Sequence, residues 1–263
     1  MKKTTLATKD SDLLEKLIIK YGKVVTANQI EAEAKHTWDY QQTHNRIQQL
    51  VKNGWLIRIK RGLYVITDLS SRGFLSVSPY AIANLLVEES YISFEAALAY
   101  RGMFDQFTGQ FTSVSLKQYK VTDLDSIQYR FTKTQQKMFV GWETVEIENM
   151  PAKIAFAEKA LVDLIHFRKG KYVVDLVTEK LQNYQEDLDT DKLFQYASLA
   201  SLKTMKVLGF VFDLLGMNSE QFFQSISNSR STHRMSPDDK TFNSKWRLYY
   251  DKYFEKYQTA KRD

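Results

Sequence analysis

The order of helix-like and strand-like segments in the first 72 residues constrains the fold of this chain more than any other feature. Three short segments with helical spacing of apolar residues precede WLIRIKRGLYVI, in which apolar and basic residues alternate or cluster around Gly62. Alternation on both sides of a glycine is typical of a two-stranded hairpin. Three helices followed by a basic hairpin is the element order of a winged helix-turn-helix. The sequence therefore predicts a winged helix over residues 1–72.

Capping residues and apolar stripes give approximate bounds for the first two helices. Asp10 or Ser11 can cap the first helix, which ends at Gly22, and Thr26 can cap the second. The residues expected to face the core are Leu13, Leu14, Leu17, Ile18, Ile30 and Ala34.

The third predicted helix runs from about Asp39 to Lys52 and ends at Asn53–Gly54. Its outward face carries amides, whereas a merely solvated helix more often carries Glu–Lys pairs. Asn and Gln can bond adenine edges bidentately, and Arg can bond guanine. The residues at helical spacing toward the core are Tyr40, Thr43 or His44, Ile47, Leu50 and Val51.

This helix and the hairpin supply the candidate DNA-binding residues. The helix would lie in the major groove, and the hairpin would place cations beside phosphates or the minor groove. The alternatives are a polar surface helix and a solvated hairpin without a partner. His44 by itself is interpreted as a packing or edge residue, and Trp55 as a core residue. The candidates are Gln41, Gln42, Asn45, Arg46, Gln49 and Lys52 on the helix, and Arg58, Lys60 and Arg61 in the wing.

The distribution of charge agrees with a nucleic-acid module at the N-terminus. The net charge is +6, and residues 1–68 hold 12 Lys and Arg against 7 Asp and Glu. The remaining residues hold 25 against 24, so nearly all of the excess lies in the first quarter of the chain. A locally basic segment is the electrostatic footprint of nucleic-acid binding, although a solvated basic face has the same composition.

Three blocks of sequence resemble the AbiE antitoxin family. GWLIRIKRGLYVI is similar to the end of the family's winged helix, G-x-L-x-R-x-x-R-G-x-Y, here Gly54, Leu56, Arg58, Arg61, Gly62 and Tyr64. Residues 90–102 resemble its SYIS-x-x-SAL-x-x-HG block, and residues 154–164 resemble A-x-P-EKAL-x-DL. The resemblance covers about residues 10–165. It departs from the family at Arg101 and Ala157, where the family often has His and Pro.

The resemblance implies a role as well as a fold. It implies a winged helix that represses the promoter of its own toxin–antitoxin operon, and an antitoxin acting in phage abortive infection. The expected partners are double-stranded DNA and a nucleotidyltransferase-like toxin. The family is classed as type IV, in which antagonism does not require a stable toxin–antitoxin complex.

Residues 73–263 are predicted to form a second, antitoxin domain, so that the chain is α+β: a winged helix, then an α+β domain with a small antiparallel sheet and a helical C-terminal half. Residues 69–80 have the composition of a linker. Ser93 is a candidate N-cap. Residues 225–239 are expected to be a loop or disordered. The predicted strands are 111–116, 127–131 and 139–147, and the predicted helices are 79–87, 94–100, 154–167, 172–184, 192–199, 202–215, 219–225 and 243–257.

A catalytic role for this second domain is the main alternative. A divergent metal-dependent nuclease would need carboxylates and a lysine around one magnesium site. Glu158, Lys159 and Asp163 are the candidates, but adjacent residues diverge by about 100° around a helix. The sequence therefore favours a structural role in which Glu158 and Lys159 cap and pair at a helix start. A plain protein-interaction module is the other alternative. The prediction is no enzyme, no cofactor and no metal.

Cysteine content and hydropathy bear on the compartment. The chain has no cysteine, which excludes disulfides and thiolate metal sites and fits a reducing environment. No run approaches the 18 apolar residues of a membrane span, and the N-terminus lacks the apolar run of a signal peptide. We expect a cytoplasmic, nucleoid-associated protein with no membrane partner.

Overall fold

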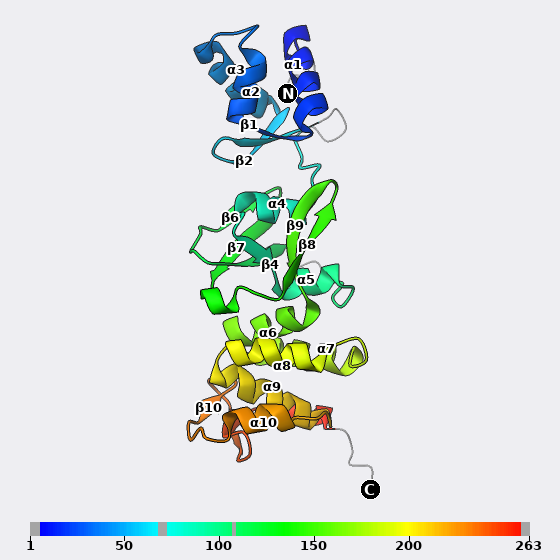
Figure 1. The fold of residues 1–263 in the computed structure, drawn as a ribbon, viewed down its shortest axis with the longest axis vertical. Coiled ribbons are helices and arrows are strands. Elements are labelled where there is room, and N and C mark those ends of the chain that lie inside the picture. The colour runs from blue at the N-terminus through cyan, green and yellow to red at the C-terminus, as the bar shows by residue number, and fades with distance from the viewer. Residues whose placement is uncertain (1–5, 68–72, 107–108, 259–263) are drawn as a thin grey trace. The chain divides into compact units, whose positions relative to one another are not determined.

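The computed structural model describes residues 6–67, 73–106 and 109–258 (Figure 1). The chain divides into two compact units. The first holds the described residues up to Glu88 together with 122–128 and 146–151, and the second holds the rest. The predicted domain boundary after residue 72, and residues 69–72 of the predicted linker, lie outside the described ranges. That boundary therefore stays a prediction.

The N-terminal elements follow the order predicted for a winged helix. Helices α1 (Thr8–Tyr21), α2 (Ala27–Ala34) and α3 (Tyr40–Asn53) precede the hairpin of β2 (Leu56–Lys60) and β3 (Leu63–Ile66). The sequence did not reveal β1 (Val24–Thr26), which pairs antiparallel with β3 and completes a sheet of order β1-β3-β2.

Local hydrogen bonds explain where these helices begin and end. Thr26 and Asp39 each form a capping box, with Gln29 and Gln42 respectively, in which side chain and backbone bond reciprocally. Gly54 ends α3 in the left-handed conformation at φ 78°. The predicted cap of α1 is wrong: the helix begins at Thr8 without a side-chain cap, because Asp10 lies inside the helix and accepts a bond from Arg46 instead.

The predicted core of the winged helix is largely confirmed. Two predictions are wrong, since Ile18 is 42% exposed and Tyr40 is 72% exposed. Ile18 lies at the edge of the α1 stripe. Tyr40 is the first residue of α3, where a side chain directed toward the helix N-terminus has no preceding turn to cover. The confirmed core residues are Leu13, Leu14, Leu17, Ile30, Ala34, Thr43, Ile47, Leu50 and Trp55.

The next sheet has six strands in the order β6-β7-β5-β4-β9-β8. It agrees with the predicted α+β class but is larger than the small sheet predicted. It has twice the strands predicted, and one pair is parallel: β4 runs antiparallel to β5 but parallel to β9 through Ile92 and Ile154. Its strands are β4 (Ser90–Ile92), β5 (Gln110–Ser115), β6 (Thr122–Leu124), β7 (Ile127–Lys133), β8 (Trp142–Ile147) and β9 (Met150–Ala155), and the accompanying helices are α4 (Pro79–Leu86), α5 (Phe94–Tyr100) and η1 (Gln136–Met138).

The helical C-terminal half is confirmed. Its first helix begins at Ala157 and not at Ile154, because Ile154 and Ala155 belong to β9. Within the described ranges, no helix is long and apolar enough to cross a membrane. The helices are α6 (Ala157–Phe167), α7 (Lys171–Asn183), α8 (Thr190–Leu199), α9 (Leu202–Leu214) and α10 (Glu220–Ile226).

The predicted terminal helix over 243–257 is wrong. Residues 241–250 form a hairpin of β11 (Thr241–Asn243) and β12 (Leu248–Tyr250), which β10 (His233–Arg234) extends. The helical spacing fails because the Asn243 side chain accepts the Trp246 backbone N–H, and Arg247 has φ 49°, which turns the chain.

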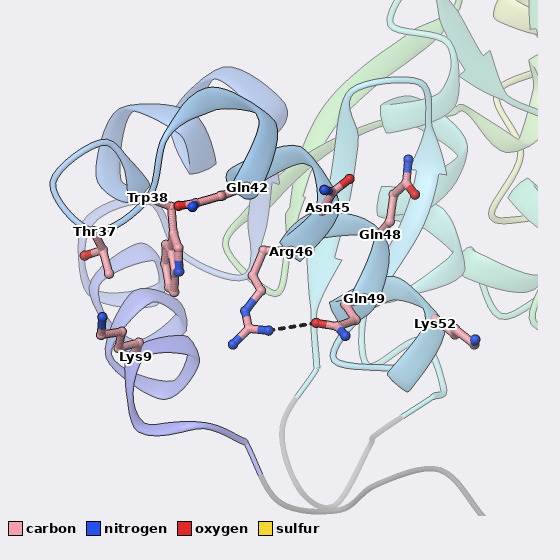
Figure 2. A pocket seen from close by; sticks show the side chains of 9 residues that line it. All are labelled: Lys9, Thr37, Trp38, Gln42, Asn45, Arg46, Gln48, Gln49 and Lys52. Carbon is pink, nitrogen blue, oxygen red and sulfur yellow. Dashed lines mark hydrogen bonds between the residues drawn. The ribbon is translucent and has the colours of Figure 1, made fainter.

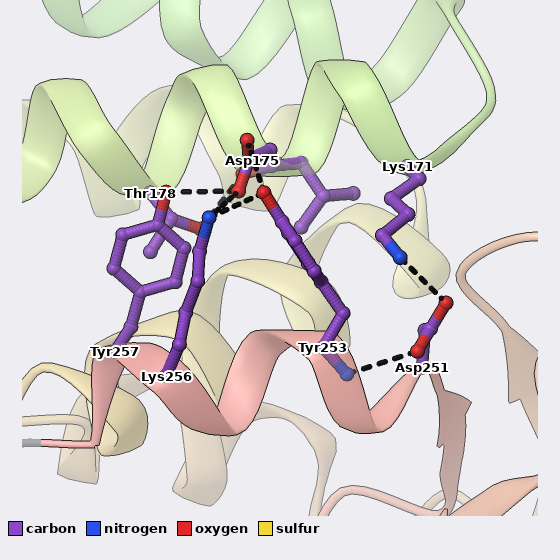
Figure 3. A network of polar contacts seen from close by, with 8 residues as sticks. Lys171, Asp175, Thr178, Asp251, Tyr253, Lys256 and Tyr257 are labelled. Carbon is purple, nitrogen blue, oxygen red and sulfur yellow. Dashed lines mark hydrogen bonds and ion pairs between the residues drawn. The ribbon is translucent and has the colours of Figure 1, made fainter.

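Only a short 3₁₀ helix, η2 (Lys252–Tyr257), remains of that prediction, and it is held to α7 (Figure 3). Asp175 of α7 accepts hydrogen bonds from the hydroxyls of Tyr253 at 3.0 Å and Tyr257 at 2.8 Å, and pairs with Lys256 at 3.0 Å. Burial, followed by the bond to Asp175, raises the pKa of Tyr257 to about 12, so it stays a neutral donor. These tyrosines therefore serve to anchor the end of the described chain.

Gly209 of α9 gives a direct test of this packing. A Cβ added at Gly209 would overlap the ring of Trp246, which is fully buried in the described structure. We expect Gly209→Ala to lower the free energy of unfolding by about 1–3 kcal/mol through overpacking, although alanine is the better helix former by about 1 kcal/mol. Urea unfolding measures this. Gln182→Ala on the exposed face of α7 is the control, and a Gly209 variant at least as stable as the parent contradicts the packing.

Candidate nucleic-acid interface

The outward face of α3 is hollowed by a groove of about 740 Å³ (Figure 2). The opposite face of the helix is buried through Thr43, Ile47 and Leu50. The core thus orients α3 so that its amide-rich face is presented outward, as predicted from the spacing. The groove is lined by Lys9, Thr37, Trp38, Gln42, Asn45, Arg46, Gln48, Gln49 and Lys52.

Arg46 lies on the flank of this face nearest α1. Its Nε donates to Asp10 Oδ1 at 2.7 Å, and its Nη1 donates to Gln49 Oε1 at 2.7 Å. The guanidinium carbon is 5.9 Å from the centre of the Trp38 ring. The Arg46 side chain is 32% exposed, against 10% for Asp10. The predicted base-reading arginine is therefore partly buried and already paired in the free protein.

Four other polar side chains of α3 bond in pairs along the helix. Gln41 donates to Asn45 at 3.3 Å, and Gln48 and His44 approach to 3.0 Å. All four are exposed. Exposed pairs four residues apart hold their side chains only weakly, so they can exchange these bonds for base edges.

The wing cations are exposed on the outer face of β2 and its turn. Arg58 and Lys60 are exposed and Ile59 between them is buried, at the point where the register of β2 against β3 shifts. Arg61 follows in the turn that Gly62 closes at φ 76°. Lys60 Nζ also donates to the Leu86 carbonyl at 3.3 Å. The structure thus places six predicted site residues on α3 and three on the wing.

Sequence reasoning missed several groove residues. Gln48 lines the groove and is not among the predicted DNA-binding residues. Lys9 reaches the groove from α1, and Trp38 reaches it from the turn that precedes α3. Tyr40, which was expected to be buried, is an exposed aromatic at the start of α3.

The two other family-like blocks meet in a buried polar cluster in the second unit. Asp163 of α6 pairs with Lys159 and accepts hydrogen bonds from Tyr91 at 3.1 Å and Ser93 at 2.7 Å. All four residues are at most 1% exposed. Burial, and then the Asp163 charge, raise the pKa of Tyr91, so its hydroxyl stays a donor. Ser93 precedes α5 but makes no side-chain cap, which corrects that prediction.

The carboxylates considered for a nuclease do not share a site. Glu158 accepts the Asp189 backbone N–H at 2.9 Å, whereas Asp163 bonds Lys159, Tyr91 and Ser93. The predicted pairing of Glu158 with Lys159 at the helix start is wrong, because the two point to different partners. Where the structure describes the chain, no group of three or more His, Asp or Glu side chains could hold a metal ion.

Comparisons with known proteins bear on both the interface and the fold. Residues 12–67 match a family described as "Transcriptional regulator, AbiEi antitoxin", which confirms the predicted resemblance over that segment. The crystal structure of the RV2827C protein from Mycobacterium tuberculosis has a similar fold, with a TM-score of 0.65 at 12% sequence identity over 94% of this chain and 92% of that one. Among curated proteins none matches. The blocks at 90–102 and 154–164 lie outside the matched segment, and their resemblance stays a prediction.

Proposed function

We propose that this chain, whose residues 12–67 match the AbiEi antitoxin family of transcriptional regulators, binds double-stranded DNA in a sequence-specific way. That match is the observation that carries the proposal. It falls on a winged helix whose α3 presents an exposed amide-rich face, with exposed cations on the adjoining hairpin. Amides and cations are the groups that read base edges and neutralise phosphates.

The polar residues of α3 and the cations would make different contacts with DNA. Gln41, Gln42, Asn45, Arg46 and Gln49 of α3 would contact base edges in the major groove and set sequence preference. The cations that would contact phosphates and set affinity are Lys52, Arg58, Lys60 and Arg61.

We further propose that the DNA is the promoter of the chain's own toxin–antitoxin operon, and that the second unit antagonises a nucleotidyltransferase-like toxin in phage abortive infection. The resemblance supports this role. The proposed antagonism requires neither catalysis nor a stable complex with the toxin. Asp163 and Glu158 are buried, and both carboxylates already accept hydrogen bonds from donors of the protein. This supports a non-enzymatic role.

Binding of the promoter fragment across a salt series tests the DNA-binding proposal. Affinity should fall steeply with salt, because phosphate neutralisation releases counterions. Gln42→Ala should weaken cognate binding by about 1–3 kcal/mol and relax discrimination between bases. Because Gln42 also forms part of the capping box of α3, urea unfolding must first show that the variant is folded. Gln182→Ala, on the second unit, is the control. Salt-independent binding, or equal loss of cognate and nonspecific binding in the Gln42 variant, contradicts the assignment of α3.

Co-expression with the neighbouring toxin tests the antitoxin proposal. Cells should survive toxin expression when the chain is present, and a Gln42→Ala variant that no longer represses should still protect them. DNA cleavage by the purified protein with magnesium would instead establish the nuclease alternative.

A further inference from the structure

An acidic side chain lies directly behind the candidate DNA-binding face. Asp10 belongs to α1, in the most basic part of the chain, and is buried. Its Oδ1 accepts the Nε–H of Arg46 at 2.7 Å across a separation of 36 residues. A buried carboxylate is unfavourable without a partner, so this ion pair ties the start of α1 to the middle of α3.

The Arg46 guanidinium also bonds Gln49, a second residue proposed to contact bases. Arg46 Nη1 donates to Gln49 Oε1 at 2.7 Å, and the Trp38 ring lies 5.9 Å from the guanidinium carbon (Figure 2). In the part of the chain that the structure describes, Arg46 Nη2 has no hydrogen-bond partner. Two nitrogens are thus held by the protein, and the third keeps its donors for another acceptor.

Such restraint matters because an arginine side chain loses much rotamer freedom when it binds. A guanidinium restrained before binding loses less, and it presents its donors in a constant direction. Guanine O6 and N7 are the acceptors that arginine reads in the major groove. Asp10 itself would repel phosphates, so it contributes nothing favourable to nonspecific binding.

We propose that Asp10 is a positioning residue for sequence discrimination: it holds Arg46, and through Arg46 the amide of Gln49, in the geometry that reads a guanine-containing base pair. The inference rests on the proposed DNA-binding function. It predicts that an acidic residue improves the choice of sequence while slightly opposing affinity for DNA in general.

The test compares binding of the full-length chain to its promoter fragment and to an unrelated duplex of equal length at one salt concentration. Asp10→Asn is expected to lower the cognate-to-nonspecific ratio about tenfold, with nonspecific binding unchanged or tighter. Asp12→Asn, an exposed acid on the same helix, removes the same charge and should leave the ratio unchanged. In an Arg46→Ala background, Asp10→Asn should have no further effect on the ratio.

Asp10→Glu covers the case in which Asp10→Asn does not fold. It keeps the charge beside Arg46 but displaces the guanidinium by one methylene, so the ratio should again fall. An unchanged ratio in the folded variants, or a ratio that falls equally in the Arg46→Ala background, overturns the inference. Proportional loss of both binding modes also overturns it, because that is the result of a purely structural tie. If the parent protein does not distinguish the two duplexes, the proposed function itself fails.

Discussion

Asp163→Asn is expected to lower the free energy of unfolding by about 3–5 kcal/mol, because it leaves the Lys159 ammonium buried without a counter-charge. Lys159 is 1% exposed and Asp163 is fully buried. The asparagine keeps the size of the side chain and an oxygen for Tyr91 and Ser93, so neither a cavity nor lost hydroxyl bonds explain the expected effect. Urea unfolding of the full chain measures it.

Two further variants isolate the charge. Asp187→Asn makes the same change at an exposed position and should lie within about 0.5 kcal/mol of the parent. Adding Lys159→Met to Asp163→Asn removes the unpaired charge and should recover most of the lost stability. If Asp163→Asn alone is as stable as the parent, the Lys159–Asp163 ion pair does not hold residues 90–102 and 154–164 together.

The expected destabilisation by Asp163→Asn limits its use in tests of catalysis. Loss of protection or repression in an Asp163 variant does not identify a catalytic carboxylate unless the variant is shown to be folded. Glu158→Gln is the milder change, because its amide oxygen can still accept the Asp189 N–H. The metal-dependent alternative is therefore better tested with Glu158→Gln and with magnesium than with a variant that also carries Asp163→Asn.

The second large effect is expected in the wing. Replacing Arg58, Lys60 and Arg61 together by alanine should weaken DNA binding about 500-fold near 0.1 M salt, if each cation neutralises one phosphate. The slope of log affinity against log salt should become shallower by about 2.7. Cognate and nonspecific duplexes should be affected alike, since phosphates carry no sequence information.

The matched control removes three exposed lysines from the second unit: Lys120, Lys133 and Lys137. Its net charge changes by the same amount, so it measures what bulk electrostatics contribute. If both triple variants lose the same affinity, the wing has no local contact with DNA. If the wing variant loses only cognate binding, the roles assigned to the wing and α3 are wrong.

Local sequence was sufficient to predict the winged helix. Helical spacing identified the faces that are buried through Leu17, Ile30 and Ile47, and the alternation around Gly62 identified the hairpin. Such patterns succeed because they depend on the periodicity of one helix or strand. They failed for residues 243–257, where a suitable spacing of aromatics was overridden by the turn at Arg247 and by the burial of Trp246 against Gly209.

The sequence by itself thus determined the class of fold, which face of α3 is exposed, and that exposed cations lie on the hairpin. Only the tertiary structure decided which of the polar and charged side chains bond to one another. Asp10 meets Arg46 because α1 crosses beside α3, and Asp163 meets Ser93 because β4 lies beside β9. The members of each pair lie 36 and 70 residues apart. No local periodicity encodes such a contact, because it forms only when separate elements bury their apolar faces together.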